Sequence, residues 1–226
     1  MSRGVRSFLT LLAGLIIFML LPLAGWGINS VESFFRNPAR LMFISAALVL
    51  NVYASVKIPE IGKEKSKGEK TVKRQHYAVL FLQVFSILLV FSSPYFDRRN
   101  ILEIESAEYL RYAGLILYAS GFLLMHLAES YLGRQFSIEV SIQKDHKLLT
   151  DGPFKYIRHP RYLGIISFSA GIAFIFLSWI GLLLSFLILL VLLWRISDEE
   201  KLMADEFGSE WNNYSGKTKR LIPFIY

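Results

Sequence analysis

Apolar residues occur in this sequence as long blocks that are separated by shorter polar and charged segments. Four of these blocks lie in the first 130 residues, at about 7–28, 39–57, 77–94 and 109–129. Each is close to the roughly 20 residues that a helix needs to cross a hydrocarbon core of ~30 Å. The pattern predicts four membrane-spanning helices, with a kink at Pro22 in the first and an end at Ser92-Ser93-Pro94 in the third.

The last apolar block, residues 162–194, is too long for one crossing, because a single helix of that length would measure roughly 50 Å. We expect two short helices that form a hairpin and turn near Ser178-Trp179-Ile180-Gly181. Residues 198–207 can extend the second of these helices, with Gly208 as its cap. The apolar tail beyond, including Trp211 and Tyr214, is expected to pack back onto the bundle or to lie in the headgroup layer.

The composition agrees with an all-α integral membrane protein of about six transmembrane helices, since 54% of the 226 residues are apolar. The net charge of +7 would also suit a nucleic-acid binder. However, the basic residues lie in the loops between apolar blocks, so membrane lipids rather than nucleic acid are the expected partners. Because the chain has no cysteine, it has no disulfide, thiolate metal site or cysteine nucleophile, and we predict no metal site.

Loop charge predicts the orientation in the membrane. Segments 57–74 and 130–161 are rich in Lys and Arg, whereas the loops after the first and third blocks carry few net positive charges. By the positive-inside rule, this alternation places both termini in the cytoplasm. The basic loop 57–76 is predicted to be a flexible, solvated linker, and contact with anionic lipid headgroups is a second interpretation.

Polar residues that could do chemistry flank the last apolar block. His159 precedes a proline, which favours an extended or turn geometry, and it could donate a hydrogen bond or move a proton near neutral pH. Arg195 and Glu199 share one helix face, and a guanidinium suits a carboxylate or phosphate. If the block doubles back, these side chains meet. An ordinary histidine in a charged turn and a surface ion pair are the alternatives that the residues leave open.

Three polar residues belong to the fourth block. Arg111 and Glu129 are expected to extend to the two membrane interfaces. His126 lies deeper, and an interhelical hydrogen bond is the expected role.

Several motifs follow one another in fixed order over residues 130–226. They are His146-Lys147-Leu148-Leu149, Gly152-Pro153-Phe154, Arg158-His159-Pro160-Arg161-Tyr162, Arg195 with Glu199-Glu200, and the segments 206–214 and 221–224. This series resembles the isoprenylcysteine carboxyl methyltransferase family, which is related to the phospholipid N-methyltransferases. The first 130 residues match only as generic membrane helices. The resemblance therefore implies an N-terminal part, 1–129, and a methyltransferase catalytic region, 130–226.

In that family the C-terminal half encloses S-adenosylmethionine in a cytoplasmic pocket. The resemblance implies cofactor contacts at Ser141, His146, Lys147, Leu148, Leu149, Phe154, His159, Pro160, Arg161, Tyr162 and Glu199. It gives Arg195 a substrate-binding role, so that Arg195 and Glu199 would be the catalytic pair. The family commonly has Tyr at the position of Phe154, and Phe154 keeps the ring while lacking one hydrogen bond.

The resemblance favours methylation of an isoprenylcysteine carboxylate, or of a similar lipophilic acid, that enters from the bilayer. Such an acceptor is already ionised and needs only to be held by Arg195. An ethanolamine phospholipid is the alternative acceptor, and it would need Glu199 or His159 as a base. A transporter or a non-catalytic scaffold is a rival from another class, but a transporter should carry charges at mid-membrane. A sterol-type reductase should need a larger basic phosphate site.

Overall fold

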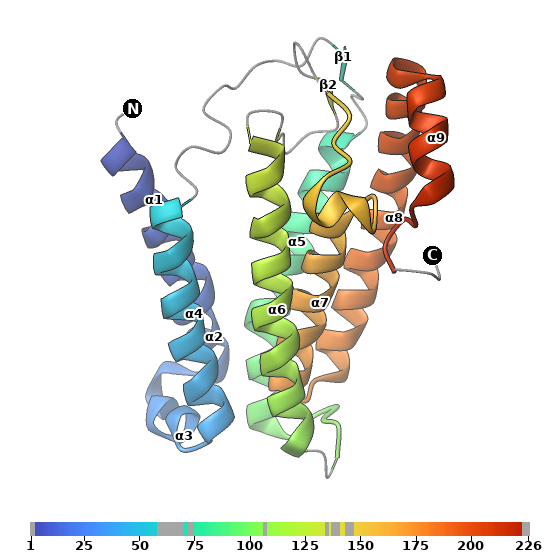
Figure 1. Ribbon diagram of the computed structural model, residues 1–226. Coiled ribbons are helices and arrows are strands. Elements are labelled where there is room, and N and C mark those ends of the chain that lie inside the picture. Colours follow the sequence, from blue (N-terminus) through green and yellow to red (C-terminus); the bar gives the residue numbers. More distant parts are fainter. Residues whose placement is uncertain are drawn as a thin grey trace.

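The structure is a computed structural model, and it describes residues 3–57, 70–71, 75–105, 108–133, 136, 141–142 and 147–222. These residues form a bundle of long helices (Figure 1). The N-terminal elements are α1 (Arg3–Leu15), the π-helical turn η1 (Ile16–Leu20), α2 (Leu21–Trp26), η2 (Ile28–Ser30), α3 (Val31–Phe35) and α4 (Pro38–Lys57). The later helices are α5 (Gln75–Arg99), α6 (Glu108–Leu132), η4 (Gly152–Lys155), α7 (Pro160–Ile175), α8 (Trp179–Phe207) and α9 (Ser209–Lys217).

The all-helical membrane architecture predicted from the sequence is confirmed. Among the described residues, five helical stretches are long and apolar enough to cross a membrane: Ser7–Trp26, Pro38–Val56, Gln75–Arg99, Glu108–Leu132 and Trp179–Phe207. The sixth predicted helix, α7, is apolar but has only 16 residues. The start of α1, η4 and α9 lie at one end of the bundle, and α3 lies at the other (Figure 1).

The last apolar block doubles back as predicted. Helix α7 ends at Ile175 and α8 begins at Trp179. At the turn, the Ser178 hydroxyl accepts a hydrogen bond from the Gly181 N–H at 3.0 Å, which caps the first turn of α8. The Ile104 N–H donates to the Leu177 carbonyl at 2.8 Å, so the loop after α5 also holds the turn. Beyond the membrane block, α8 continues to Phe207, and Gly208 caps it with a φ of 50°.

The expectation that a helix ends at Pro94 was wrong. Helix α5 does not end at Pro94 but continues to Arg99; membrane helices tolerate an internal proline because neighbouring groups satisfy the freed backbone. The kink at Pro22 stays a prediction; Pro22 is the second residue of α2, which follows η1. The wider π-helical turn gives room for the proline ring, which would otherwise clash with the carbonyl of Phe18 four residues earlier.

The basic loop is more ordered at its end than the sequence suggested. Lys70–Thr71 (β1) pairs antiparallel with Ser141–Ile142 (β2), so these two residues are not part of a free linker. Ladder hydrogen bonds between distant segments cannot be recognised from the composition of a Lys-rich loop. Residues 58–69 and 72–74 of the loop lie outside the described residues.

A buried ionic cluster occupies the end of the bundle that carries α3. The Arg111 guanidinium donates to Asp97 at 2.8 and 3.0 Å and to the Ile175 carbonyl at 2.7 Å. Arg40 lies 3.4 Å from the same Asp97 carboxylate. Arg111 is only 2% exposed, so the expectation that it extends to the interface was wrong. The carboxylate and the C-terminal carbonyl of α7 compensate the buried charge.

Glycines allow α6 and α7 to form the most extensive helix pair in the described bundle. Gly114 and Gly121 of α6 face Gly171 and Gly164 of α7. A Cβ atom added to Gly171 would lie 2.5 Å from the Tyr118 backbone nitrogen and 2.8 Å from the Gly114 carbonyl oxygen. Small residues let two membrane helices approach backbone to backbone, and this contact fixes the start of α7, where the candidate site begins.

We therefore predict that Gly171→Ala destabilises the protein by about 1–3 kcal/mol, the usual effect of overpacking, because only backbone atoms could move aside. The measurement is unfolding in detergent micelles followed by helical circular dichroism. Gly216→Ala is the matched control, since no heavy atom lies within 4 Å of a Cβ added there. A Gly171→Ala protein as stable as the Gly216→Ala protein would contradict this packing.

Candidate functional site

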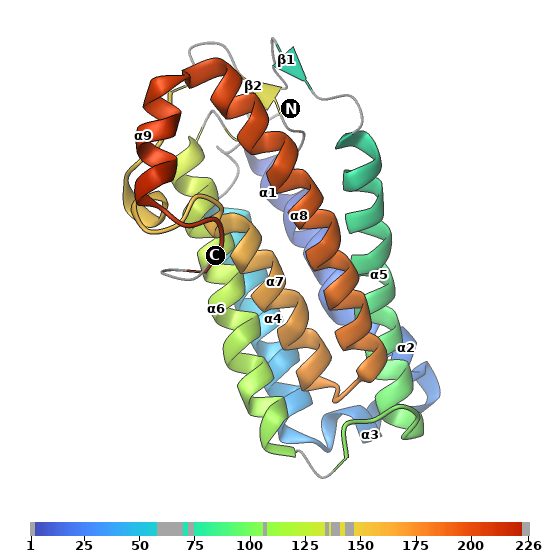
Figure 2. The same cartoon turned by 90° about the vertical axis from the view of Figure 1, so that its right-hand side faces the viewer.

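The hairpin brings the start of α7 and the C-terminal part of α8 to the end of the bundle that carries α9 (Figure 2). His159 is the residue before Pro160, at the N-cap position of α7. Arg195 and Glu199 lie on the part of α8 that runs alongside. The sequence expectation that these three residues meet therefore agrees with the geometry.

A hydrogen-bonded series connects the residues of α7 and α8. The Tyr162 hydroxyl donates to Glu199 Oε2 at 2.7 Å, and Arg195 Nε donates to the same hydroxyl at 3.3 Å. His159 Nδ1 lies 3.9 Å from Glu199 Oε2, and the His159 ring stacks on the Tyr162 ring with centroids 5.5 Å apart. Arg195 is 2% exposed. The series places a buried cation and a partly exposed carboxylate on two sides of one phenol.

Glu200 fixes the other side of His159. Its carboxylate accepts from Arg158 Nε and Arg220 Nε, each at 2.8 Å, and lies 3.3 Å from His159 Nε2. Arg158 also donates to the carbonyl groups of Ser215 and Thr218. This network ties the segment after α9 to the start of α7, so the C-terminal tail becomes one wall of the site.

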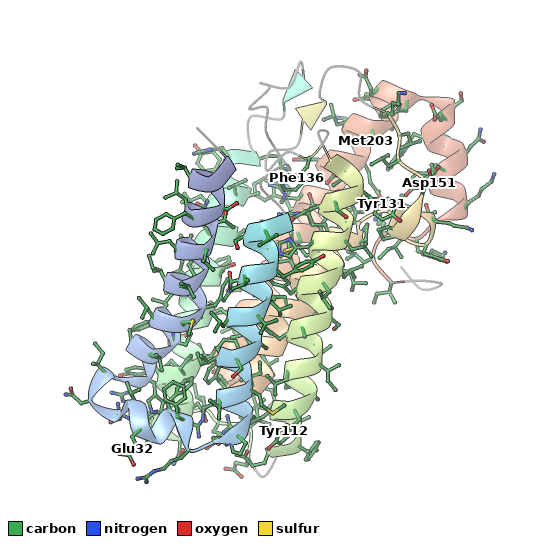
Figure 3. The ribbon with its side chains drawn as sticks, turned by 60° about the vertical axis from the view of Figure 1, so that its left-hand side comes forward. Glu32, Tyr112, Tyr131, Phe136, Asp151 and Met203 are labelled. Atoms are coloured by element: carbon green, nitrogen blue, oxygen red, sulfur yellow. The ribbon has the colours of Figure 1, made fainter. Side chains whose placement is uncertain are left out.

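A hollow with a volume of about 50 Å³, open on one side, lies beside this network. Six residues that the resemblance assigned to cofactor binding line it: Lys147, Leu148, Leu149, Phe154, His159 and Glu199. Five further residues line it that were not assigned to the site: Leu132, Arg158, Met203, Trp211 and Tyr214. Figure 3 shows Met203 at this end of the bundle, with Glu32 and Tyr112 at the opposite end.

The apolar tail residues have an explanation in this arrangement. Trp211 and Tyr214 are buried, as is Leu221, and the tail packs back onto the bundle. The Tyr214 hydroxyl donates to the Phe154 carbonyl at 2.8 Å. Burial raises the pKa of Tyr214 to about 12, so the phenol remains a donor at neutral pH and holds α9 against η4. Aromatic residues in an otherwise polar tail were the sequence signal for this wall.

Of the other predicted site residues, Pro160, Arg161, Tyr162 and Arg195 are described and lie outside the lining of the hollow. Pro160 begins α7. Tyr162 contacts the hollow-lining Glu199 through its hydroxyl, and Arg195 contacts Tyr162 in turn. The side chain of Ser141 and all of His146 lie outside the described residues. Arg161 turns away towards α6: its Nε donates to Glu129 Oε1 at 2.8 Å and its guanidinium lies 5.0 Å from the Phe136 ring centre.

The Arg161 contact corrects two expectations for α6. The Glu129 side chain is 8% exposed, so it does not extend to the membrane interface as predicted. It is stabilised by Arg161 and by His126, whose Nδ1 lies 2.8 Å from Glu129 Oε2. His126 therefore bonds within its own helix rather than across helices, because a residue three positions along the same helix already offers a charged acceptor.

In the described ranges, no group of three or more His, Cys, Asp or Glu residues could hold a metal ion.

Comparisons with known proteins agree with this arrangement. Residues 113–205 match the model of the Isoprenylcysteine carboxyl methyltransferase (ICMT) family. The similarity to the ICMT family thus spans residues 113–205. The match includes α7, most of α8 and the residues of the Arg195–Tyr162–Glu199 series, so the resemblance predicted from the motifs is confirmed.

Individual ICMT relatives match over part of their length. A probable protein-S-isoprenylcysteine O-methyltransferase of Oryza sativa subsp. indica is 29% identical over 130 residues, which are 54% of this chain and 66% of the relative. The protein-S-isoprenylcysteine O-methyltransferase of Schizosaccharomyces pombe is 34% identical over 100 residues, 41% of each chain. That of Saccharomyces cerevisiae is 33% identical over 119 residues, 50% of this chain and 48% of the relative. The chain spans no more than about two thirds of these relatives.

A solved structure extends the similarity of fold to nearly the whole chain. The structure of a eukaryotic intramembrane Ras methyltransferase ICMT superimposes with a TM-score of 0.54, covering 99% of this chain and 75% of the other. The sequence identity is 22%. The N-terminal helices, which matched the family only as generic membrane segments in sequence, therefore take part in the shared fold.

Proposed function

We propose that this protein is an integral membrane methyltransferase that uses S-adenosylmethionine to methylate the carboxylate of an isoprenylcysteine or a similar lipophilic acid. The observation that carries the proposal is the Arg195–Tyr162–Glu199 series, which joins a buried cation to a carboxylate at the edge of the hollow. The family match and the names of the O-methyltransferase relatives support the same activity.

The residues around the hollow fit the chemistry of the cofactor. The Glu199 side chain is 27% exposed, and its carboxylate could accept from ribose hydroxyls or attract a cation. Phe154 and Trp211 also line the hollow, and the face of an aromatic ring favours a positive charge. When bound, S-adenosylmethionine supplies an electrophilic methyl group on a positively charged sulfur. The hollow would hold only part of such a molecule.

Arg195 is the residue that would hold the acceptor. A guanidinium binds a carboxylate through two parallel hydrogen bonds, and a cation that is 2% exposed strongly favours an anion beside it. Tyr162 accepts from Arg195 and donates to Glu199, so each side chain is fixed in orientation by the next. Positioning of this kind accounts for most of what a protein contributes to a displacement reaction.

A carboxylate acceptor agrees better with the site than the amine of an ethanolamine phospholipid. A carboxylate is ionised at neutral pH and needs no base. An ammonium group must first lose a proton, and the two candidate bases are already engaged: Glu199 accepts from Tyr162, and His159 faces Glu200. We therefore retain the O-methyltransferase as the proposed activity.

The hollow is proposed to face the cytoplasm, and the acceptor to enter from the surrounding bilayer. The start of α1 and the strand β1, from the basic loop, lie at the same end of the bundle as the hollow (Figure 1). With the positive-inside rule, this position supports a cytoplasmic placement of both termini.

A methyl-transfer assay tests the proposal. The purified protein in lipid nanodiscs is supplied with methyl-labelled S-adenosylmethionine and, separately, with N-acetyl-S-farnesyl-cysteine, N-acetylcysteine or phosphatidylethanolamine. We expect label only in the farnesylated acid, in a form that mild base releases as methanol, because a methyl ester is labile to base. Base-stable label in the phospholipid would establish the N-methyltransferase instead, and no transfer to any acceptor would refute a methyltransferase.

A further inference from the structure

Gln75 is a buried polar residue whose role in the site has not been assigned. It is the first residue of α5 and is 0% exposed. Its Nε2 donates to Oδ2 of Asp198 on α8, and Asp198 is itself 5% exposed. Because an ionised carboxylate can only accept hydrogen bonds, the amide must present its NH₂ group to Asp198. The orientation of the Gln75 carbonyl is fixed by this contact.

The other end of the amide is a buried acceptor in need of a donor. Among the residues that the structure describes, none donates a hydrogen bond to Gln75 Oε1. Buried polar atoms are paired in the great majority of cases, because an unpaired one loses its hydration without compensation. An enclosed acceptor that is held in place by a neighbouring carboxylate, and that has no donor among the described residues, is suited to a donor that arrives with a ligand.

The position of Gln75 relative to Arg195 indicates which ligand group could reach it. Asp198 and Arg195 are three residues apart on α8, so they are neighbours on one helix face at roughly 5–6 Å between Cβ atoms. Glu199 lines the hollow, whereas Arg195, Asp198 and Gln75 do not. Around the axis of α8, Arg195 therefore lies between Glu199, which lines the hollow, and Asp198, so the Gln75–Asp198 pair lies on the side of Arg195 away from the hollow.

We propose that Gln75 Oε1 accepts a hydrogen bond from the amide N–H of the acceptor's cysteine, while Arg195 holds its carboxylate. This inference rests on the proposed function. The amide nitrogen and the carboxylate of a C-terminal cysteine are attached to the same carbon atom, so they are separated by only a few bonds. Gln75 is thus a specificity-determining residue that selects an acylated prenylcysteine, as at the end of a protein chain, over a thioether acid without an N–H.

The test compares two acceptors that differ in this one donor. One is N-acetyl-S-farnesyl-cysteine, and the other is its ester counterpart, in which an oxygen atom replaces the N–H. We expect wild-type kcat/KM to favour the amide by about tenfold, the effect of one neutral hydrogen bond. Gln75→Met should reduce the preference to within about twofold of unity, because the acceptor atom is gone.

Gln83→Met is the matched control, since Gln83 lies exposed on the same helix, and it should keep the wild-type preference. Loss of a purely structural contact would lower both rates together and leave their ratio unchanged. Equal wild-type rates for the two acceptors, or an unchanged preference in Gln75→Met, would overturn the inference. If Gln75→Met does not fold, the wild-type ratio decides alone. If the wild-type protein methylates neither compound, the proposed function itself fails, and this inference fails with it.

Discussion

Replacing Arg195 with leucine is expected to lower kcat for methyl transfer by about 10²–10³-fold while the Kd for S-adenosylmethionine changes by less than about threefold. Arg195 lies behind Tyr162 and does not line the hollow, so its removal should spare the cofactor side. Its loss should leave the acceptor carboxylate without a buried cation. Turnover and cofactor binding are measured on the same preparation, by labelled methyl transfer and by calorimetry.

Two further variants sharpen this test. Arg195→Lys keeps the charge but loses the planar fork of donors, so it should recover part of the activity. Arg36→Leu removes an arginine from an exposed ion pair with Glu32, at the end of the bundle that carries α3, and should leave turnover unchanged. An Arg195→Leu protein with wild-type kcat would contradict the role of Arg195 in holding the acceptor, and one that also loses cofactor binding would show that Arg195 contributes to the cofactor site.

Replacing Glu199 with glutamine is expected to weaken S-adenosylmethionine binding by roughly 10–100-fold, the effect of losing a charge-assisted hydrogen bond. The substitution keeps the shape of the side chain and its contact with Tyr162, but removes the negative charge at the edge of the hollow. Glu210→Gln is the matched control, because Glu210 is an exposed carboxylate on nearby α9. Equal affinities in the wild-type and Glu199→Gln proteins would show that the carboxylate does not face the cofactor.

The parts of the structure that the sequence predicted follow from length and spacing. A hydrocarbon core of fixed thickness requires residues 162–194 to double back, and the structure has α7 and α8 with the turn at Ser178. The four-residue spacing of Arg195 and Glu199 places both on one face of α8. Once the hairpin is known, the meeting of His159 with these residues follows, because both clusters lie at its open end.

The remaining features depend on contacts between segments that are distant in sequence. Gln75 and Asp198 are separated by 123 positions, and no periodicity marks their contact. Glu129 looked like an interfacial residue because its partner, Arg161, lies on another helix. The role of Trp211 also depends on contacts with distant segments. Its apolar character was evident in the sequence, but the surface that it covers was not.

The most direct test of the proposed methyl-donor site is a calorimetric titration of the wild-type protein with S-adenosylmethionine. We expect saturable binding of one cofactor per chain at micromolar concentration. We expect this binding to be lost in the His159→Ala protein, because the imidazole of His159 lines the hollow between Glu199 and Glu200. Binding that survives in His159→Ala would move the cofactor to another place. No binding to the wild-type protein would contradict the central claim that this end of the bundle is a methyl-donor site.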